Sequence, residues 1–310
     1  MQPTQLTSGD VIADRRADYA KMLNDGGEAE AAADLMEQAL ELAPEWAAGW
    51  YRLATYRETA GNKTGAVDAY RRTLDLGRDD IFGAGLKLAL LGDVAIPDQP
   101  PSSYVERLFD DYADRFETSL VKKLDYSVPG KLARLIVSTG RRYRSCVDLG
   151  CGTGLLGPEI RDRVDRLEGF DLSQNMLAKA AEKRIYDHLA QADLSLAPMA
   201  TGLFADGAEH RADLVTAADV LMYLGNLESV FEGVVALSAP GADFVFSVED
   251  SGEGGGFRLA ASLRYAHSEP YVQGLCERHG FEVLDMTRTA IRKDGANVIS
   301  GILFLARKGA

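Results

Sequence analysis

Residues Ser145–Gly157 read Ser-Cys-Val-Asp-Leu-Gly-Cys-Gly-Thr-Gly-Leu-Leu-Gly, and this stretch constrains the fold more than any other. An apolar run ends in three alternating glycines, and a helical pattern opens at Pro158. The pattern predicts a β-strand, a tight turn and a helix N-terminus, an arrangement that holds a nucleotide-like ligand. Gly150, Gly152 and Gly154 let the main chain turn sharply and approach that ligand without a Cβ in the way.

Two cofactor classes fit the spacing of this loop. Its glycines satisfy the dinucleotide-binding fingerprint, and Asp171 lies about 20 residues further on, where an acid that binds ribose is expected. Asp148, however, stands just before the first glycine, where a carboxylate repels a pyrophosphate but attracts the sulfonium and ammonium of S-adenosylmethionine. The acid favours the methyl donor; a tight turn without a ligand is the third alternative. At this loop the chain resembles the class I S-adenosylmethionine-dependent methyltransferases.

Composition limits the classes of protein that remain. The chain has 310 residues, of which 46% are hydrophobic, which is enough for two domains with ordinary cores. The net charge of −13 comes without a basic patch, so we expect no nucleic-acid partner. No apolar run approaches a membrane span, and the first residues lack a signal-peptide pattern. We therefore expect no membrane contact. The three cysteines, Cys146, Cys151 and Cys276, lack metal-ligand spacing, so we expect no metal site and a reducing, cytoplasmic environment.

An internal repeat occupies the N-terminal part of the chain. A shift of about 34 residues aligns Ala20 with Ala54, Gly27 with Gly61 and Ala32 with Ala66. With Pro44 closing the first unit and Trp50 near the start of the second, the region resembles tetratricopeptide (TPR) repeats, although Arg78 stands where the second unit would have its proline. The resemblance implies an all-α TPR-like domain over 1–95. Its repeats either bind a protein partner or serve as a structural or oligomerising accessory.

A proline-rich linker and an aromatic segment come next. Three prolines within 96–103 prevent a continuous helix. Apolar residues recur at helical spacing over 104–126, which predicts a helix with an aromatic face. These aromatic residues could simply pack in the core, and this alternative stays open. The segment nevertheless resembles the N-terminal lid of a methyltransferase subgroup, through the motif Phe109-Asp-x-Tyr-Ala-x-x-Phe followed by Leu124-Asp-Tyr. The resemblance implies that Tyr112 and Tyr126 pack against the donor.

Acids follow the second and third predicted strands. At the end of the strand over 167–171, Asp171 can accept hydrogen bonds from two ribose hydroxyls. Asp193 ends the next strand; the resemblance implies that it and the Leu194 amide bind adenine, with Met176 at the side of the ring. Without the preceding motifs, Asp171 could equally well be a helix-cap acid, and Asp193 could equally well be a surface acid that ends its strand. The full predicted donor set is Tyr112, Tyr126, Asp148, Gly150, Cys151, Gly152, Gly154, Asp171, Leu172, Met176, Asp193, Leu194 and Asp219.

The acceptor is expected beyond the fourth strand, over 213–219. The carboxyl ends of strands one and four flank the crevice of an open α/β sheet, so Asp219 and Tyr223 should lie beside the transferred methyl. His267 is the candidate general base because its ordinary pKa is near neutrality; a polar loop residue is the alternative. Tyr223 is the second candidate catalytic residue. The predicted substrate-binding set is Tyr223, Glu249, Tyr265 and His267.

The last third of the chain completes the fold. We expect a strand over 243–248, followed by a glycine-rich mobile loop over 251–256. Two further strands are expected over 281–287 and 299–306, and the turn signal at 293–296 between them predicts a C-terminal antiparallel hairpin. The expected fold is therefore α/β, a Rossmann-like seven-stranded methyltransferase sheet over 104–310.

With its repeats, the chain resembles the bacterial predicted methyltransferases that carry a TPR segment. The resemblance implies an S-adenosylmethionine-dependent enzyme with a small-molecule acceptor. Two alternatives remain: a protein methyltransferase whose repeats recruit the substrate, and a non-catalytic adaptor that retains the donor-binding fold.

Overall fold

The structure is a computed structural model that describes residues 6–77, 79–113, 116, 126–205, 207–252, 254–294 and 297–309. The chain divides into two compact units, Met1–Pro97 and Asp98–Ala310. Asp98, within the predicted linker, already belongs to the second unit, because its carbonyl oxygen accepts hydrogen bonds from the amides of Gly225 and Asn226. Arg78 lies outside the described residues, as do 114–115 and 117–125 of the predicted lid.

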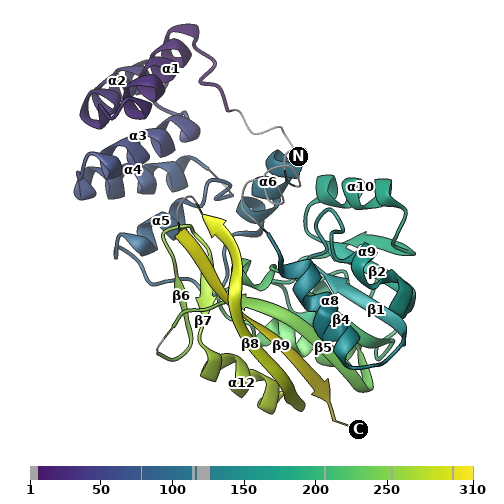
Figure 1. The fold of residues 1–310 in the computed structure, drawn as a ribbon. Helices are drawn as coiled ribbons and strands as arrows, with labels where there is room; N and C mark the ends of the chain where they lie inside the picture. Colours follow the sequence, from purple (N-terminus) through teal and green to yellow (C-terminus); the bar gives the residue numbers. More distant parts are fainter. Residues whose placement is uncertain are drawn as a thin grey trace. The chain divides into compact units, whose positions relative to one another are not determined.

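The first unit is all α, as predicted (Figure 1). Its helices are α1 (Val11–Asp25), α2 (Ala29–Leu42), α3 (Ala47–Thr59), α4 (Lys63–Leu76) and α5 (Ala84–Leu90). Asp10 caps α1 by accepting from the amides of Ile12 and Ala13, and small residues such as Ala17 and Ala20 are buried where helices pack. The TPR assignment of this unit stays a prediction.

The second unit contains one seven-stranded sheet in the order β3-β2-β1-β4-β5-β9-β8. Its strands are β1 (Tyr143–Leu149), β2 (Val164–Asp171), β3 (His188–Gln191), β4 (Ala212–Ala217), β5 (Ser238–Glu249), β8 (Phe281–Asp294) and β9 (Asn297–Lys308). Strands β1 to β5 are parallel, whereas β9 pairs antiparallel with both β5 and β8. The predicted sheet and its C-terminal antiparallel strands are thus confirmed. The strand order reverses at β1 and β4, where open α/β sheets bind ligands.

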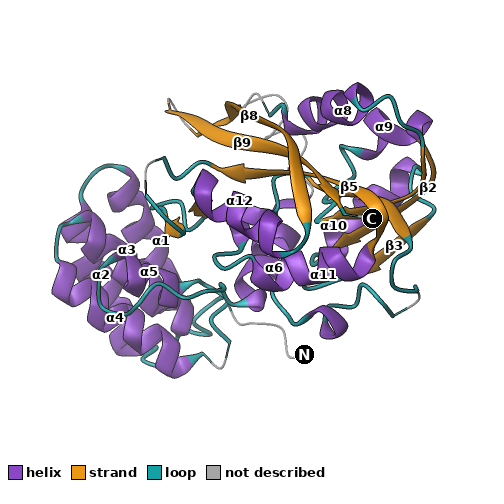
Figure 2. Cartoon of the chain, turned by 90° about the horizontal axis from the view of Figure 1, so that it is seen from below, coloured by secondary structure: helices purple, strands orange, loops and turns teal. Residues whose placement is uncertain are grey.

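Helices cover both faces of this sheet (Figure 2). On one face, α11 (Glu228–Leu237) and α12 (Glu269–Arg278) pack against phenylalanines of β5, including Phe244 and Phe246. On the other face, α8 (Val128–Ser138) buries Leu132 and Ile136. The remaining helices are α6 (Ser102–Tyr112), α9 (Gly157–Ile160) and α10 (Gln174–Lys183). No described helix is both long enough and apolar enough to cross a bilayer.

Two local elements differ from the sequence expectation. The helix expected from Pro158 is a single turn, α9, followed by a 3-10 turn over Arg161–Arg163. Beyond the glycine-rich loop, of which residue 253 lies outside the described part, β6 (Phe257–Leu259) and β7 (Tyr265–His267) form an antiparallel hairpin of their own. The sequence pattern there was mixed and predicted no such hairpin. In the expected turn at 293–296, residues 295 and 296 are not among those described.

Candidate active site

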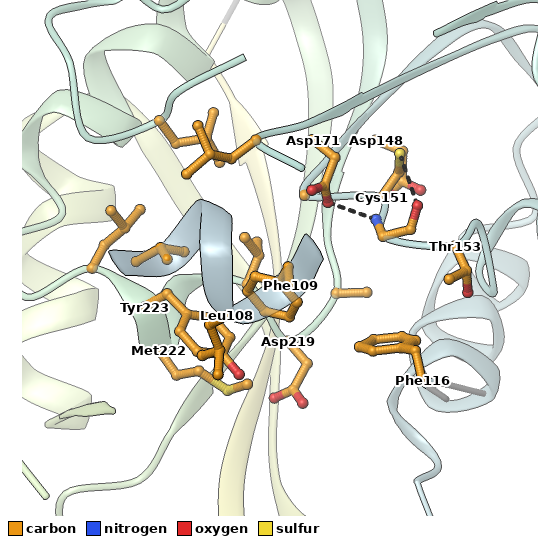
Figure 3. A pocket seen from close by; sticks show the side chains of 18 of the residues that line it. Leu108, Phe109, Phe116, Asp148, Cys151, Thr153, Asp171, Asp219, Met222 and Tyr223 are labelled. Carbon is orange, nitrogen blue, oxygen red and sulfur yellow. Dashed lines mark hydrogen bonds between the residues drawn. The ribbon is translucent and has the colours of Figure 1, made fainter. Parts of the chain in front are cut away.

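A cavity of about 330 Å³ lies where β1, β2 and β4 end, a size typical of small-molecule sites. Figure 3 shows Asp148, Cys151 and Asp171 at one end of it, and Met222, Tyr223 and Asp219 at the other. We call these the donor end and the acceptor end. The sequence-predicted residues that line the cavity are Tyr112, Tyr126, Asp148, Gly150, Cys151, Gly152, Asp171, Leu172, Asp193, Leu194, Asp219 and Tyr223.

The glycine loop has the left-handed backbone that its sequence predicts. The φ angles of Gly150, Gly152 and Gly154 are 62°, 56° and 79°. A Cβ on Gly150 would lie 2.2 Å from Val220, so this glycine is required by packing as well. A Cβ on Gly152 would meet nothing closer than Phe116, at 3.8 Å. Gly152 therefore leaves room for a ligand to approach the main chain, whereas Gly154 supports the turn without lining the cavity.

Asp171 is placed to accept further hydrogen bonds. Its Oδ2 accepts from the Gly152 amide at 2.8 Å, and its Oδ1 accepts from the Ser173 amide at 2.9 Å. Each carboxylate oxygen has two lone pairs, so one on each oxygen remains for a hydroxyl of the ligand. Burial raises the pKa of the Asp171 carboxyl to about 6, while the amides of Ser173, Gly152 and Leu172 act in the opposite direction. The pair of free acceptor positions fits a ribose diol.

Asp148 uses both of its oxygens inside the protein. They accept hydrogen bonds from the Thr216 hydroxyl and the Tyr186 hydroxyl, each at 2.7 Å. The side chain is only 1% exposed, and burial raises its pKa to about 6. Asp148 thereby ties β1 to β4 and fixes Tyr186 beside the glycine loop. It also lines the cavity, so the contact with a cationic donor expected from the sequence stays a prediction.

The adenine side needs one correction. Asp193 Oδ1 accepts from the amide and hydroxyl of Ser195, at 2.9 and 2.6 Å, whereas no described residue donates to Oδ2. Asp193 and Leu194 line the cavity and therefore keep their predicted place. Met176 does not: it is fully buried in α10, so it cannot lie beside an adenine ring. Leu172, which lines the cavity, is the apolar neighbour at this end.

Aromatic residues of α6 and the segment after it cover the cavity. Tyr112, Phe116 and Tyr126 line it, and the rings of Phe109 and Tyr223 meet edge to face with centroids 4.8 Å apart. The described part of the predicted lid therefore contributes to the site. Cys151 also lines the cavity, and its thiol pKa is raised well above the ordinary value by burial, so the thiol is protonated.

A buried ion-pair network closes the acceptor end. Arg292, 3% exposed, donates from Nη1 to both oxygens of Asp219, at 3.0 and 2.9 Å, and from Nη2 to Glu249. Asp219 has a φ of 57°, which is strained for a residue with a side chain. Glu249 does not line the cavity, so its predicted contact with an acceptor is not supported. Sequence patterning did not predict Arg292 at this site, because a β-bulge between Ala290 and Arg292 shifts the register of the strand.

His267 and Tyr265 lie outside the cavity lining. Both are fully buried, and His267 Nε2 is 2.9 Å from the Gly225 carbonyl oxygen, to which it donates. Desolvation lowers the pKa of His267 to about 4, so the ring is neutral near pH 7. The expectation that His267 takes a proton from the acceptor is therefore wrong in geometry. From the same segment, Arg264 does line the cavity, although the sequence reasoning assigned it no role.

Comparisons with known proteins identify relatives of this chain. Two curated relatives are a malonyl-[acyl-carrier protein] O-methyltransferase of Enterobacter lignolyticus (29% identical, 39% of this chain and 44% of the relative) and a ubiquinone biosynthesis O-methyltransferase of Azoarcus sp. (31% identical, 45% of this chain and 59% of the relative). The chain thus spans about half the length of the curated relatives it matches.

A solved structure shares the fold. It is the 1,6-didemethyltoxoflavin-N1-methyltransferase of Burkholderia thailandensis, with a TM-score of 0.53 and 20% identity over 70% of this chain and 94% of that one. That structure contains S-adenosylhomocysteine, the demethylated form of the donor, and the expectation of S-adenosylmethionine as the cofactor is confirmed. A family model described as a methyltransferase domain matches residues 105–285. Since this match covers more than half of the sequence, the chain belongs to the methyltransferase-domain family.

Proposed function

We propose that the protein is an S-adenosylmethionine-dependent methyltransferase that acts on a small molecule, with oxygen as the methylated atom. The observation that carries this proposal is Asp171, which lies in the cavity wall beside the open main chain of Gly152 and keeps two acceptor positions free. Both curated relatives are O-methyltransferases by name, which supports oxygen as the acceptor atom.

The donor-end residues have complementary roles in this proposal. Asp171 accepts from the ribose hydroxyls, Asp193 Oδ2 accepts from the adenine amine, and the Leu194 amide donates to the ring. The main chain at Gly152 faces the amino-acid part of the donor. The bound donor supplies an activated methyl group on a sulfonium, so the protein mainly has to hold the acceptor in line with it.

The acceptor-end residues provide position and a proton donor. Burial raises the pKa of the Tyr223 hydroxyl, which therefore stays protonated and can donate to the acceptor. Tyr112, Phe116 and Tyr126 exclude water, which strengthens the electrostatic interactions in the site. None of the described lining residues is a histidine or a lysine, so positioning of the acceptor has the larger part in the rate.

Calorimetry with S-adenosylhomocysteine tests the donor assignment. Asp171→Ala should lose about 1.5–3 kcal/mol of binding free energy, because charge-assisted hydrogen bonds to the ribose disappear. The matched control is Asp165→Ala on the same strand, whose side chain is 70% exposed in its contact with Arg142. Unchanged affinity in a folded Asp171→Ala protein, or tighter binding of a nicotinamide dinucleotide by the wild type, contradicts the proposal.

A further inference from the structure

The turn between β6 and β7 brings Arg264 to the acceptor end of the cavity. The turn is closed by two main-chain hydrogen bonds, from Ala260 N to Arg264 O at 2.8 Å and from Leu263 N to Ala260 O at 2.9 Å. Leu263 has a φ of 60°, an uncommon and strained conformation for a leucine. The protein thus holds a strained turn at the point where the arginine enters the cavity wall.

The hairpin is anchored by the residues around it. His267 Nε2 donates to the Gly225 carbonyl, and the Leu227 amide donates to the Tyr271 hydroxyl at 2.9 Å. The Ser268 amide also donates to the Gly256 carbonyl at 3.0 Å. The first two contacts join the hairpin and the start of α12 to the segment that follows β4, and the third joins the residues at the two ends of the hairpin. His267 and its neighbours therefore fix the hairpin, and Arg264 is the side chain that the hairpin presents to the cavity.

The two arginines at this end have different electrostatic surroundings. Arg292 is neutralised by Asp219 and Glu249, as described above. Arg264 forms no ion pair with any residue that the structure describes. Its Nε donates to the Tyr223 hydroxyl oxygen at 3.2 Å, and its guanidinium carbon lies 5.8 Å from the centre of that ring. No described residue accepts a hydrogen bond from its terminal nitrogens, which leaves a planar, charged donor group at the cavity.

Besides the Arg292–Asp219 ion pair, the acceptor end has mainly apolar side chains. Leu108 and Phe109 of α6 lie near Met222 and Tyr223 (Figure 3), and Val105 belongs to the same packed cluster. The charge of Arg264 is balanced at longer range by Asp219 and Glu249, but its terminal nitrogens have no hydrogen-bond acceptor among the described residues. Such a group favours a carboxylate, because a bidentate ion pair satisfies its donors in a site from which water is excluded.

We propose that Arg264 binds a carboxylate of the acceptor, so that the acceptor is a small acid with an apolar body. This inference rests on the proposed function, since it concerns the second substrate of the same cavity. Arg264 acts here as a specificity-determining residue and takes no part in holding the donor.

The test compares acids with their neutral amides. Wild-type protein saturated with S-adenosylhomocysteine is titrated calorimetrically with phenylacetate and phenylacetamide, and with octanoate and octanamide, to separate an aromatic from an aliphatic body. In the pair whose body fits the cavity better, the acid should bind about ten to a hundred times more tightly than its amide. This is the range expected for hydrogen bonds to a charged group. Arg264→Gln should abolish this preference, and Arg264→Lys should retain part of it.

Arg258→Gln is the matched control, because Arg258 lies on β6 of the same hairpin, is exposed and does not line the cavity. This variant should keep the preference for acids. The inference is overturned if the wild type binds acid and amide equally or binds no acid at millimolar concentration. It is also overturned if Arg264→Gln keeps the preference for acids. The wild-type comparison decides even if the Arg264 variants do not fold. Failure of S-adenosylhomocysteine to bind in the first step instead overturns the proposed donor, and the inference with it.

Discussion

Asp148 shows how a single buried carboxyl couples stability to pH. It is almost fully buried between Thr216 and Tyr186, and burial raises its pKa to about 6. In an unfolded chain the pKa of an aspartate is about 3.9, so the folded protein keeps this proton to higher pH than the unfolded chain does. Between about pH 4 and pH 6, the contribution of Asp148 to the free energy of unfolding therefore falls as the pH rises.

Asp148→Asn removes this titration. Relative to the wild type, the variant should gain roughly 1–3 kcal/mol of unfolding free energy as the pH is raised from 4 to 7, as measured by urea denaturation of the ligand-free protein. Asp171, whose pKa is also about 6, continues to titrate in both proteins. Asp165→Asn, at an exposed site, should follow the wild type. A pH dependence of Asp148→Asn identical to that of the wild type would show that Asp148 is not the titrating group.

At the scale of elements, the β6–β7 hairpin depends on His267. Its buried ring donates to the Gly225 carbonyl and stacks on Tyr271, with centroids 6.0 Å apart. His267→Ala should lower the free energy of unfolding by roughly 2–4 kcal/mol, because a buried hydrogen bond and packed ring atoms are lost. Urea denaturation measures the loss, and calorimetry should show S-adenosylhomocysteine affinity within a few-fold of the wild type. A fully stable variant with unaltered donor binding but no turnover would restore the general-base role.

The sequence predicts the sheet better than it predicts the acceptor end. Most of the parallel strands contain a buried apolar run, although β3 is only partly buried, and the loop residues follow each strand directly, which is why Asp171 and Asp193 could be predicted from sequence. The β6–β7 hairpin has strands of three residues, too short to show alternation. Arg292 reaches the site through a β-bulge and pairs with Asp219 across a sequence separation of 73 residues. Local pattern contains no information about such a pairing.

At the scale of the whole molecule, the boundary between the units has a measurable consequence. Asp98 accepts two main-chain hydrogen bonds from the segment after β4, and Gln99 donates from its side chain to the Asn226 carbonyl at 2.6 Å. A fragment of residues 98–310 should therefore fold and bind S-adenosylhomocysteine. A fragment of 104–310 lacks these contacts and should be less stable by roughly 1–3 kcal/mol in urea denaturation. A folded 98–310 fragment that does not bind this ligand would show that the first unit contributes to the site.

The β6–β7 hairpin also affects how a protein of this architecture can change its acceptor substrate during evolution. The donor-end residues lie at the carboxyl ends of strands of the central sheet or in the loops that follow, whereas Arg264 lies in the turn of a separate two-stranded hairpin. Mutations in that hairpin alter the charge presented to the acceptor and leave the central sheet unchanged. Acceptor choice is therefore an exchangeable trait in this architecture. A library confined to residues 257–267 therefore offers a direct route to new acceptors while the donor end keeps its sequence.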